Sequence, residues 1–270
     1  MFTFDFRDVS FAHKAGFSSS PKDEFHKHMH HFYELIYFEE GEVEFHVEGL
    51  TQKLSPGDIV FIQPGQFHFA VVDHDYDYRR YVCKMPENIL PTHIVESISH
   101  FEPFFTSCEN LLPLFEALEG YAEEFLSAPE DMRTLCLAKV LELLVRLSRK
   151  EGVHLEEKRD SVARGLVDYI EAHLSERLTL ESLSAAFHYS TSYIATSFRK
   201  EMHVSLISYV RGKKVMAAHS LILHGVKPSD AASMMGFQDY STFFRSYQKM
   251  LGFPPSSAKR GTGEPGIAEE

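Results

Sequence analysis

The hydrophobic pattern of this chain changes period along its length, and that change limits the folds open to it. Between residues 33 and 82, short alternating apolar runs are separated by glycine and proline, as at Pro56-Gly57 and Pro64-Gly65. Many short strands with such turns are typical of a β-sandwich or β-barrel. From residue 110 onward, apolar residues recur at helical spacing instead. The sequence therefore predicts an α+β protein of two domains, with an N-terminal β-barrel followed by helices.

The length of 270 residues suits two domains, each with its own core. Two leucine-rich helical stretches after the barrel form a connector. Their apolar stripe suits packing within the domain and also a dimer seam, and periodicity cannot separate the two. The expected organisation is a β-barrel at 1–108, a helical connector at 109–152, a linker at 153–160, a helical domain at 161–262 and a flexible tail at 263–270.

Charge is spread unevenly along the chain, whose formal net charge is −12. Residues 1–159 carry 15 Lys and Arg against 28 Asp and Glu, a balance of −13. Residues 160–262 carry 12 against 8, a balance of +4, and the last eight residues add three Glu. This asymmetry indicates that the C-terminal half meets a polyanion, although basic surface without such a partner is also common.

No sequence feature directs the chain to a membrane or to an oxidising compartment. The chain has no run of eighteen apolar residues and no secretory signal. Its three cysteines, Cys83, Cys108 and Cys136, are odd in number and lack metal-type spacing, which suits free thiols in a reducing cytosol. We therefore expect a cytoplasmic protein with no membrane partner.

Histidine and glutamate are grouped in the predicted barrel. His28 and His30 are two residues apart, so on a strand their side chains share one face, and Glu34 keeps the same parity. His68 follows later, separated from Pro64-Gly65 by two residues. These spacings resemble the two motifs of the cupin superfamily, a β-barrel fold.

The cupin resemblance implies a ligand set. In metal-binding cupins the matching positions surround a metal, which here implies His28, His30, Glu34 and His68 around Zn, Ni, Fe or Mn. The motif is imperfect, because Gln63 replaces the usual proline. The same four side chains also suit the polar wall of a sugar pocket that needs no metal, so the sequence establishes no cofactor.

Two neighbouring arginines bear on the same pocket. Arg79 and Arg80 are the cations best suited to meet an anionic or sugar ligand. Ion pairing with the surrounding acidic residues is the simpler alternative. The predicted effector pocket consists of His28, His30, Glu34, His68 and Arg80.

The C-terminal half carries one local pattern twice. Thr179 and Ser190 are suitable N-caps for a short helix and for the helix that follows it after a tight turn. This is the helix-turn-helix pattern, whose second helix enters the major groove of DNA. After a long helix over 206–224, the pattern returns over 228–251.

Over about residues 160–260 the sequence resembles the DNA-binding domain of the AraC/XylS family. The resemblance rests above all on Gly236-Phe237-x-Asp239-x-Ser241-x-Phe243-Phe244-Arg245 with Gly252-Phe253-Pro254-Pro255-Ser256. The barrel half, from His28 to Asp58, has the arrangement of sugar-responsive members. Both halves therefore resemble one family, which implies a cupin-type sensor joined to an all-α domain with two helix-turn-helix units.

The resemblance also implies which side chains meet DNA. The matching base-reading positions are Ser192, Ala195 and Thr196 in the first unit, and Tyr240, Ser241, Thr242 and Arg245 in the second. Candidate phosphate contacts are Arg199, Lys200, Lys213, Lys214 and Lys249. Because the first set lacks long polar side chains, the second unit is predicted to carry more of the sequence specificity.

These features predict a sequence-specific transcription regulator controlled by a small ligand in the barrel, with carbohydrate suggested by the resemblance alone. The expected partners are double-stranded DNA, the effector, a second copy of the chain and RNA polymerase, and we expect no catalytic residue. One alternative is a metal-binding cupin, either a metal sensor or a metal-dependent enzyme, with a DNA-binding appendage. Another is a DNA-binding protein whose barrel only dimerises. Salt-dependent DNA binding separates the regulator from the enzyme.

Overall fold

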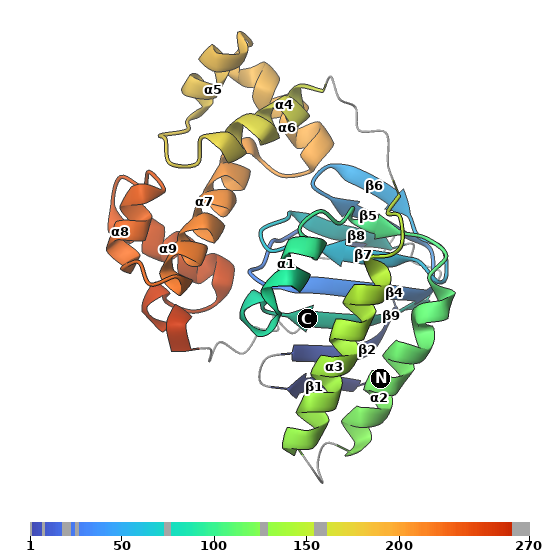
Figure 1. Ribbon diagram of the computed structural model, residues 1–270. Coiled ribbons are helices and arrows are strands. Elements are labelled where there is room, and N and C mark those ends of the chain that lie inside the picture. The colour runs from blue at the N-terminus through green and yellow to red at the C-terminus, as the bar shows by residue number, and fades with distance from the viewer. Residues whose placement is uncertain are drawn as a thin grey trace. The chain divides into compact units, whose positions relative to one another are not determined.

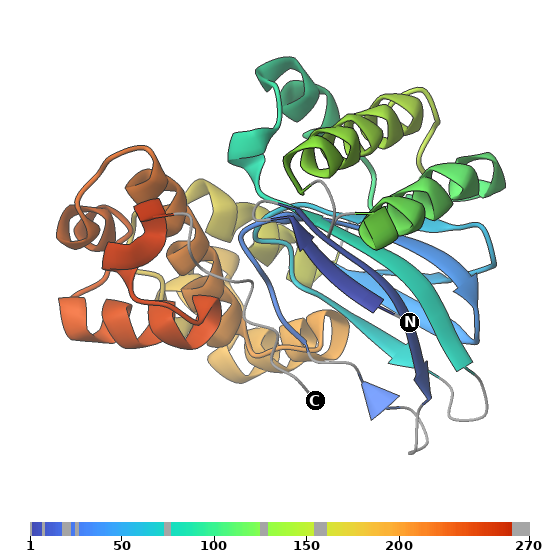
Figure 2. The same cartoon turned by 90° about the horizontal axis from the view of Figure 1, so that it is seen from below.

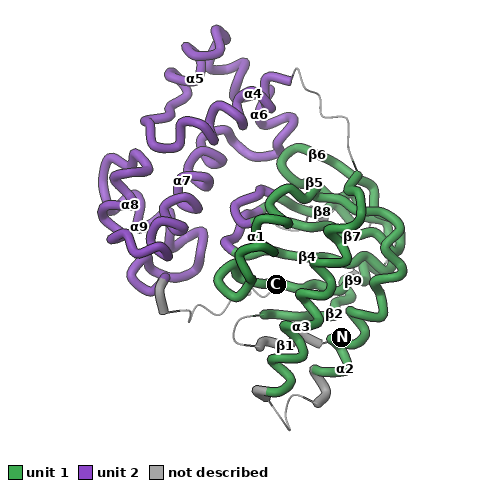
Figure 3. The backbone as a smooth tube through the Cα atoms, in the orientation of Figure 1, with its two compact units in different colours: residues 1–27, 32–63, 68–155 green, residues 28–31, 64–67, 156–270 purple. Residues whose placement is uncertain are grey.

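The computed structural model describes residues 2–6, 9–17, 23–24, 27–72, 77–124, 129–153 and 161–260. This part of the chain divides into two compact units, drawn in green and purple in Figure 3. Unit 1 consists of residues 1–27, 32–63 and 68–155, and unit 2 of residues 28–31, 64–67 and 156–270. Residues 154–160 of the predicted linker and the whole predicted tail lie outside the described residues.

Unit 1 is built on two antiparallel sheets (Figure 1). The larger has six strands in the order β1-β2-β9-β4-β7-β10, and the smaller has four in the order β3-β8-β5-β6. The strands are β1 (Phe2–Phe6), β2 (Val9–Phe17), β3 (Asp23–Glu24), β4 (Tyr33–Glu40), β5 (Val43–Val47), β6 (Leu50–Lys53), β7 (Ile59–Ile62), β8 (His68–Val72), β9 (Asp77–Met85) and β10 (Phe104–Phe105). The predicted β-rich domain is confirmed, although the two sheets do not join into one closed ring among the described residues.

The six-stranded sheet is buried on both faces, which explains the nearly continuous apolar sequence of β4. Ile36 and Phe38 pack with Val43 and Phe45 of the smaller sheet, so one core lies between the two sheets. We call this side of the six-stranded sheet the inner face. The alternate residues of β4, such as Tyr37, point to the outer face, since successive side chains of a strand alternate.

Helices cover the outer face of the six-stranded sheet (Figure 2). They are α1 (Thr92–Ile98), α2 (Leu112–Glu124) and α3 (Pro129–Leu147), with short 3-10 turns η1 (Glu87–Ile89) and η2 (Glu109–Leu111). Phe115 of α2 and Val140 and Leu144 of α3 are at most 1% exposed in this outer core. Most of the connector stripe therefore packs within its own unit, whereas Leu135 and Val145 remain 41% and 36% exposed.

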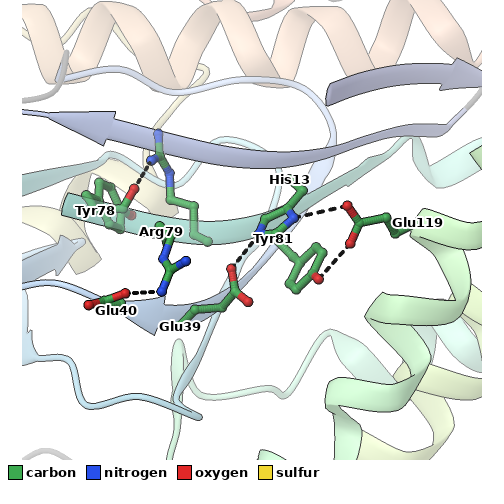
Figure 4. Close-up of polar contacts among 8 residues, drawn as sticks. His13, Glu39, Glu40, Tyr78, Arg79, Tyr81 and Glu119 are labelled. Atoms are coloured by element: carbon green, nitrogen blue, oxygen red, sulfur yellow. Dashed lines mark hydrogen bonds and ion pairs between the residues drawn. The ribbon is translucent and has the colours of Figure 1, made fainter. Parts of the chain in front are cut away.

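A polar cluster ties α2 to the sheet within this outer core (Figure 4). The His13 ring on β2 lies between two carboxylates, with Nε2 2.6 Å from Glu39 Oε2 and Nδ1 3.2 Å from Glu119 Oε1. The hydroxyl of Tyr81 donates a 2.9 Å hydrogen bond to the other oxygen of Glu119. The Tyr81 ring stacks on His13 with centroids 4.1 Å apart, so β2, β4, β9 and α2 meet at this cluster.

Unit 2 contains the helices of the C-terminal half (Figure 1). They are α4 (Val162–Ala172), α5 (Leu180–Phe187), α6 (Thr191–Met202), α7 (Leu206–Leu223), α8 (Pro228–Met234) and α9 (Tyr240–Leu251), followed by the 3-10 turn η3 (Pro255–Arg260). Thr179 and Ser190 cap α5 and α6 as predicted, with their side chains accepting from the backbone N–H of Ser182 and Tyr193. The two predicted helix-turn-helix units are thus α5–α6 and α8–α9. Among the described residues, no helix has the length and apolar character needed to cross a bilayer.

Candidate DNA-binding and effector sites

The first recognition helix, α6, presents a small and partly basic face. Ile194 and Phe198 are fully buried on one side of the helix, and Phe198 packs edge-to-face on Tyr209 of α7 with centroids 5.2 Å apart. The predicted contacts lie on the other side of the helix, where Ala195 is half-buried and the following residues are exposed: Ser192, Thr196, Arg199 and Lys200.

The C-terminal half of α6 lines a hollow of about 710 Å³. Its walls are Leu180, Ala195, Thr196, Arg199, Lys200, Ser205, Leu206 and Ile207, so the structure brings four of the predicted DNA contacts together in one concave surface. Two cations beside short side chains suit a phosphate group next to a base edge.

The second recognition helix, α9, carries longer side chains. Tyr240, Ser241, Arg245 and Lys249 are exposed, while Phe243 and Tyr247 are fully buried beneath them. Thr242 is half-buried, and its hydroxyl donates a 2.8 Å hydrogen bond to Asp239 Oδ2.

Asp239 also caps α9, because its Oδ1 accepts from the backbone N–H of Thr242 at 2.7 Å. These hydrogen bonds lower the pKa of Asp239 below its usual range. Thr242 therefore has a role in folding the helix, and contact with a base would compete with its bond to Asp239.

One predicted phosphate contact is wrong. Lys214 is only 6% exposed, and its ammonium donates to the backbone carbonyls of Glu176 and Met235, the latter at 2.7 Å. Burial lowers its pKa. Gly236 explains the arrangement: its φ is +68°, and a Cβ there would lie 2.9 Å from the Lys214 ammonium. Lys214 thus anchors the turn of the second unit.

Lys213 lies beside Lys214 but differs in its surroundings. Its Nζ is 2.9 Å from Glu171 Oε1, and its side chain is only 11% exposed. The charge of Lys213 is therefore matched within unit 2, which makes it a weaker candidate for a phosphate than Arg199 or Lys200.

Two polar residues of the predicted effector pocket, Glu34 and His68, belong to unit 1. Glu34 on β4 and His68 on β8 are 6% and 2% exposed, and Glu34 Oε2 is 3.5 Å from His68 Nε2. Lys84 of β9 adds a cation 3.7 Å from Glu34 Oε1. The His68 ring lies parallel to Phe45 with centroids 6.4 Å apart. An acid, an imidazole and an amine thus meet within an apolar core.

His28 and His30 complete the predicted set. His30 is 6% exposed, whereas His28 is exposed, and their ring centroids are 5.7 Å apart. Each of His28, His30, Glu34 and His68 offers one ligand atom, and these atoms lie within 4.8 Å of one another. The structure therefore brings together the four residues that the cupin motifs single out, and three imidazoles with one carboxylate are a donor set that transition metals accept.

The two arginines of β9 have different surroundings. Arg79 pairs with Glu40, and both side chains are more than half exposed, so the ion-pair alternative is confirmed for Arg79. Arg80 is half-buried, and its guanidinium lies 3.8 Å from the centre of the Tyr78 ring. Because side chains alternate along a strand, of these two arginines only Arg80 lies on the inner face of the six-stranded sheet, as Glu34 does.

Sequence reasoning missed Lys84, whose ammonium lies 3.7 Å from Glu34 Oε1. The available signal was strand parity, since Lys84 lies four residues after Arg80 on the same strand.

Comparison with known proteins supports both halves of the chain. Residues 13–158 match the family of AraC-like ligand-binding domains, and residues 183–261 match a helix-turn-helix domain family. The chain belongs to the AraC family of transcription regulators. It is therefore a DNA-binding regulator with an N-terminal ligand-binding domain, as the sequence predicted.

Relatives match this AraC-family regulator over most of their length. The HTH-type transcriptional regulator YobQ of Bacillus subtilis is 26% identical over 237 residues, covering 86% of this chain and 87% of YobQ. The HTH-type transcriptional activator RhaS of Escherichia fergusonii is 21% identical over 253 residues, covering 89% and 90%. A crystal structure of ToxT from Vibrio cholerae is similar with 12% identity and a TM-score of 0.43, covering 94% and 98%.

Proposed function

We propose that this AraC-family regulator binds a carbohydrate effector on the inner face of unit 1. The observation that carries the proposal is the Glu34–His68 pair, which places two polar groups 3.5 Å apart inside an apolar core. Ligand sites have this character, with a few placed polar groups among apolar side chains. The choice of carbohydrate follows the resemblance of the segment from His28 to Asp58 to sugar-responsive members.

DNA binding is proposed to use both recognition helices. Two recognition helices in units linked by a further helix, here α7, can enter successive major-groove segments. These segments are about 34 Å apart on one face of the duplex. Arg245 is proposed to donate two hydrogen bonds to a guanine, while Arg199, Lys200 and Lys249 contact phosphates. Short side chains at Ala195 and Thr196 suit the methyl group of thymine.

Control by the effector requires that the effector binds one arrangement of the protein more tightly than another. We propose that sugar binding shifts this equilibrium and so changes affinity for the operator, with RNA polymerase contacting the bound regulator. The test is a titration of labelled duplex by fluorescence anisotropy across a sugar panel. An effector should change the apparent Kd about 5- to 150-fold. If DNA binding is tight and salt-dependent but no sugar changes it or the melting temperature, the barrel is not a sugar sensor.

A homodimer is proposed on the basis of α3. Leu135 and Val145 are large apolar residues on this helix that remain 41% and 36% exposed, while most of its other apolar residues are buried. Sedimentation equilibrium should give a dimer for the full chain, and Leu135→Glu should weaken it. The control is Leu223→Glu, at a position of α7 that is 48% exposed. A monomer before any substitution would overturn the proposal.

A metal site is the second candidate function, favoured by the four ligand atoms within 4.8 Å. His28, His30, Glu34 and His68 would hold the ion, which would supply an anchoring point for ligand oxygen atoms. Elemental analysis of protein purified without chelator or nickel resin tests it. Near-stoichiometric metal that disappears in His68→Ala but persists in the control His93→Ala supports the site. Absence of metal from the unsubstituted protein rejects it.

A further inference from the structure

The segment that leads from α4 into α5 lies against the turn between α8 and α9. Gly236 in that turn has a φ of +68°, and a Cβ there would lie 2.8 Å from the backbone oxygen of Ser175 and 2.9 Å from that of Glu176. Two backbones can approach so closely at a positive φ because glycine has no side chain. We call residues 175–177, residues 235–238 and Lys214 together the joint.

The Lys214 side chain reaches the joint from α7. Its ammonium donates to the carbonyl of Glu176 on one side and to the carbonyl of Met235 on the other, the latter at 2.7 Å. Lys214 is only 6% exposed, so both hydrogen bonds are shielded from water. One side chain therefore holds the segment before α5 and the turn before α9 at the same point.

Arg177 and Gln238 extend the joint to the surface. With its amide oxygen facing the guanidinium, Gln238 accepts hydrogen bonds of 2.9 and 3.0 Å from Nε and Nη1 of Arg177. Gln238 directly precedes Asp239, the N-cap of α9, and Arg177 lies shortly before Leu180, where α5 begins. The contact thus ties the start of the first helix-turn-helix unit to the start of the second recognition helix.

The joint adds a connection to the one that α7 provides. Figure 1 shows α4, α5 and α6 around one end of α7, and α8 and α9 around the other end. The 18 residues of α7 span about 27 Å and include Gly212, which lowers helix propensity. Two bodies that share a single helix can still bend and twist about it. A contact away from the helix axis restrains both motions.

We propose that the joint fixes the separation and relative rotation of α6 and α9. Arg177, Lys214 and Gln238 are then positioning residues that select DNA by the spacing of its two specified segments. This inference rests on the proposed reading of DNA by both recognition helices. One inserted base pair lengthens the spacing by about 3.4 Å and rotates one segment by about 35° around the duplex. A pair of helices held by the joint cannot follow that change.

The test uses the two-segment duplex that the full chain selects from a random pool, together with duplexes that have one base pair added or removed between the segments. Either change should raise the Kd of the unsubstituted protein about 10- to 100-fold. Arg177→Ala and Gln238→Ala should each reduce this spacing penalty about 3- to 5-fold. The double variant should resemble either single variant, because all three lack the same contact. Arg177→Lys should keep part of the penalty, since one donor remains.

Both substituted side chains are exposed, so thermal melting should show that the variants remain folded. The matched control is Arg164→Ala, which removes an arginine that pairs with Asp168 within α4 and should leave the spacing penalty intact.

Two other roles for the pair predict different results. If Arg177 contacted a phosphate, Arg177→Ala would weaken binding equally at every spacing and lower the salt dependence by about one counterion. If Gln238 contacted a base, Gln238→Ala would change the preferred base and not the preferred spacing. Either result would overturn the inference, as would an unsubstituted protein that tolerates all three spacings. Each of these results leaves the two-segment site in place. If no two-segment site is selected, the proposed reading of DNA by two helices fails, and the inference fails with it.

Discussion

The two helix-turn-helix units share a pattern but are stabilised differently. The first relies on a capping box, in which Thr179 and Ser182 exchange hydrogen bonds, and on apolar packing of Phe198 against Tyr209. The second contains buried polar groups, since the Lys214 ammonium anchors its turn and the His219 ring contacts the Tyr247 hydroxyl at 2.5 Å. Buried polar groups are costly when one partner is lost. We therefore expect the second unit to lose more stability when one of its buried polar residues is substituted. We also expect its stability to depend more strongly on pH.

The largest expected effect comes from removing the buried cation of the second unit. Lys214→Met would leave the carbonyls of Glu176 and Met235 without their donor. We expect a loss of about 2–4 kcal/mol in the free energy of unfolding, measured by urea denaturation of the full chain. Lys213→Met, whose ion pair lies nearer the surface, should cost less than about 1 kcal/mol. Equal losses would show that Lys214 does not anchor the turn.

Acid should weaken the second unit through His219. Burial lowers the pKa of His219 to about 3, whereas an unfolded histidine titrates near 6.5. Between these values the unfolded state binds the extra proton, so stability must fall as the pH decreases from about 6.5 towards 3. His219→Gln should reduce this slope by up to about 1.4 kcal/mol per pH unit, measured by denaturation from pH 7 to pH 5. The exposed His224→Gln is the control, and an unchanged slope in His219→Gln would contradict the account.

The two helix-turn-helix units should also differ in how strongly they discriminate between DNA bases. Arg245→Ala removes a long exposed donor from α9 and should cost about 1–3 kcal/mol at one base pair, relaxing specificity there. Thr196→Ala in α6 should cost less, because it removes only a hydroxyl and a methyl group. Binding measured on duplexes with single base changes gives both values. A larger loss of specificity in Thr196→Ala would reverse the predicted order of the two units.

The smallest expected difference concerns the helix caps. Ser190 caps α6 and Asp239 caps α9, each through one backbone N–H. Ser190→Ala and Asp239→Ala should each cost about 1 kcal/mol in stability. Asp239→Ala should cost slightly more, because it also frees the Thr242 hydroxyl, and Asp239→Asn should recover most of the loss. Thermal melting of the three variants distinguishes these outcomes, and a neutral Asp239→Ala would show that the cap is dispensable.

The sequence predicted the helices and strands better than it predicted which polar side chains are buried. The repeated pattern predicted over 228–251 contains α8 and α9 and ends where α9 ends, because the buried face of α9 recurs at i and i+4 through Phe243 and Tyr247. The sequence predicts Lys214 as a phosphate contact, because lysine side chains are seldom fully buried. Its burial depends on carbonyls from α8 and from the segment after α4, which no local pattern reveals.

Similar limits apply to the effector site. Sequence spacing grouped His28, His30 and Glu34 as residues of one strand, but β4 begins at Tyr33, so only Glu34 of the three lies on that strand. Strand parity could not pair Lys84 with Glu34, because strand register is set by long-range pairing and by the burial of one face. The short strand β10 and the helix α1 were also not predicted, since both are too short to show a periodicity of their own.

Selection of binding sites from a pool of random duplexes tests the central claim most directly. If α6 and α9 both enter the major groove, the enriched sequences should contain two specified segments about 10 base pairs apart. Arg245→Ala should remove the preference in one segment and leave the other. Binding to the enriched duplex should weaken steeply with added salt. Enrichment of no sequence, or of a single segment that is unaffected by Arg245→Ala, would contradict a regulator that reads DNA with two helices.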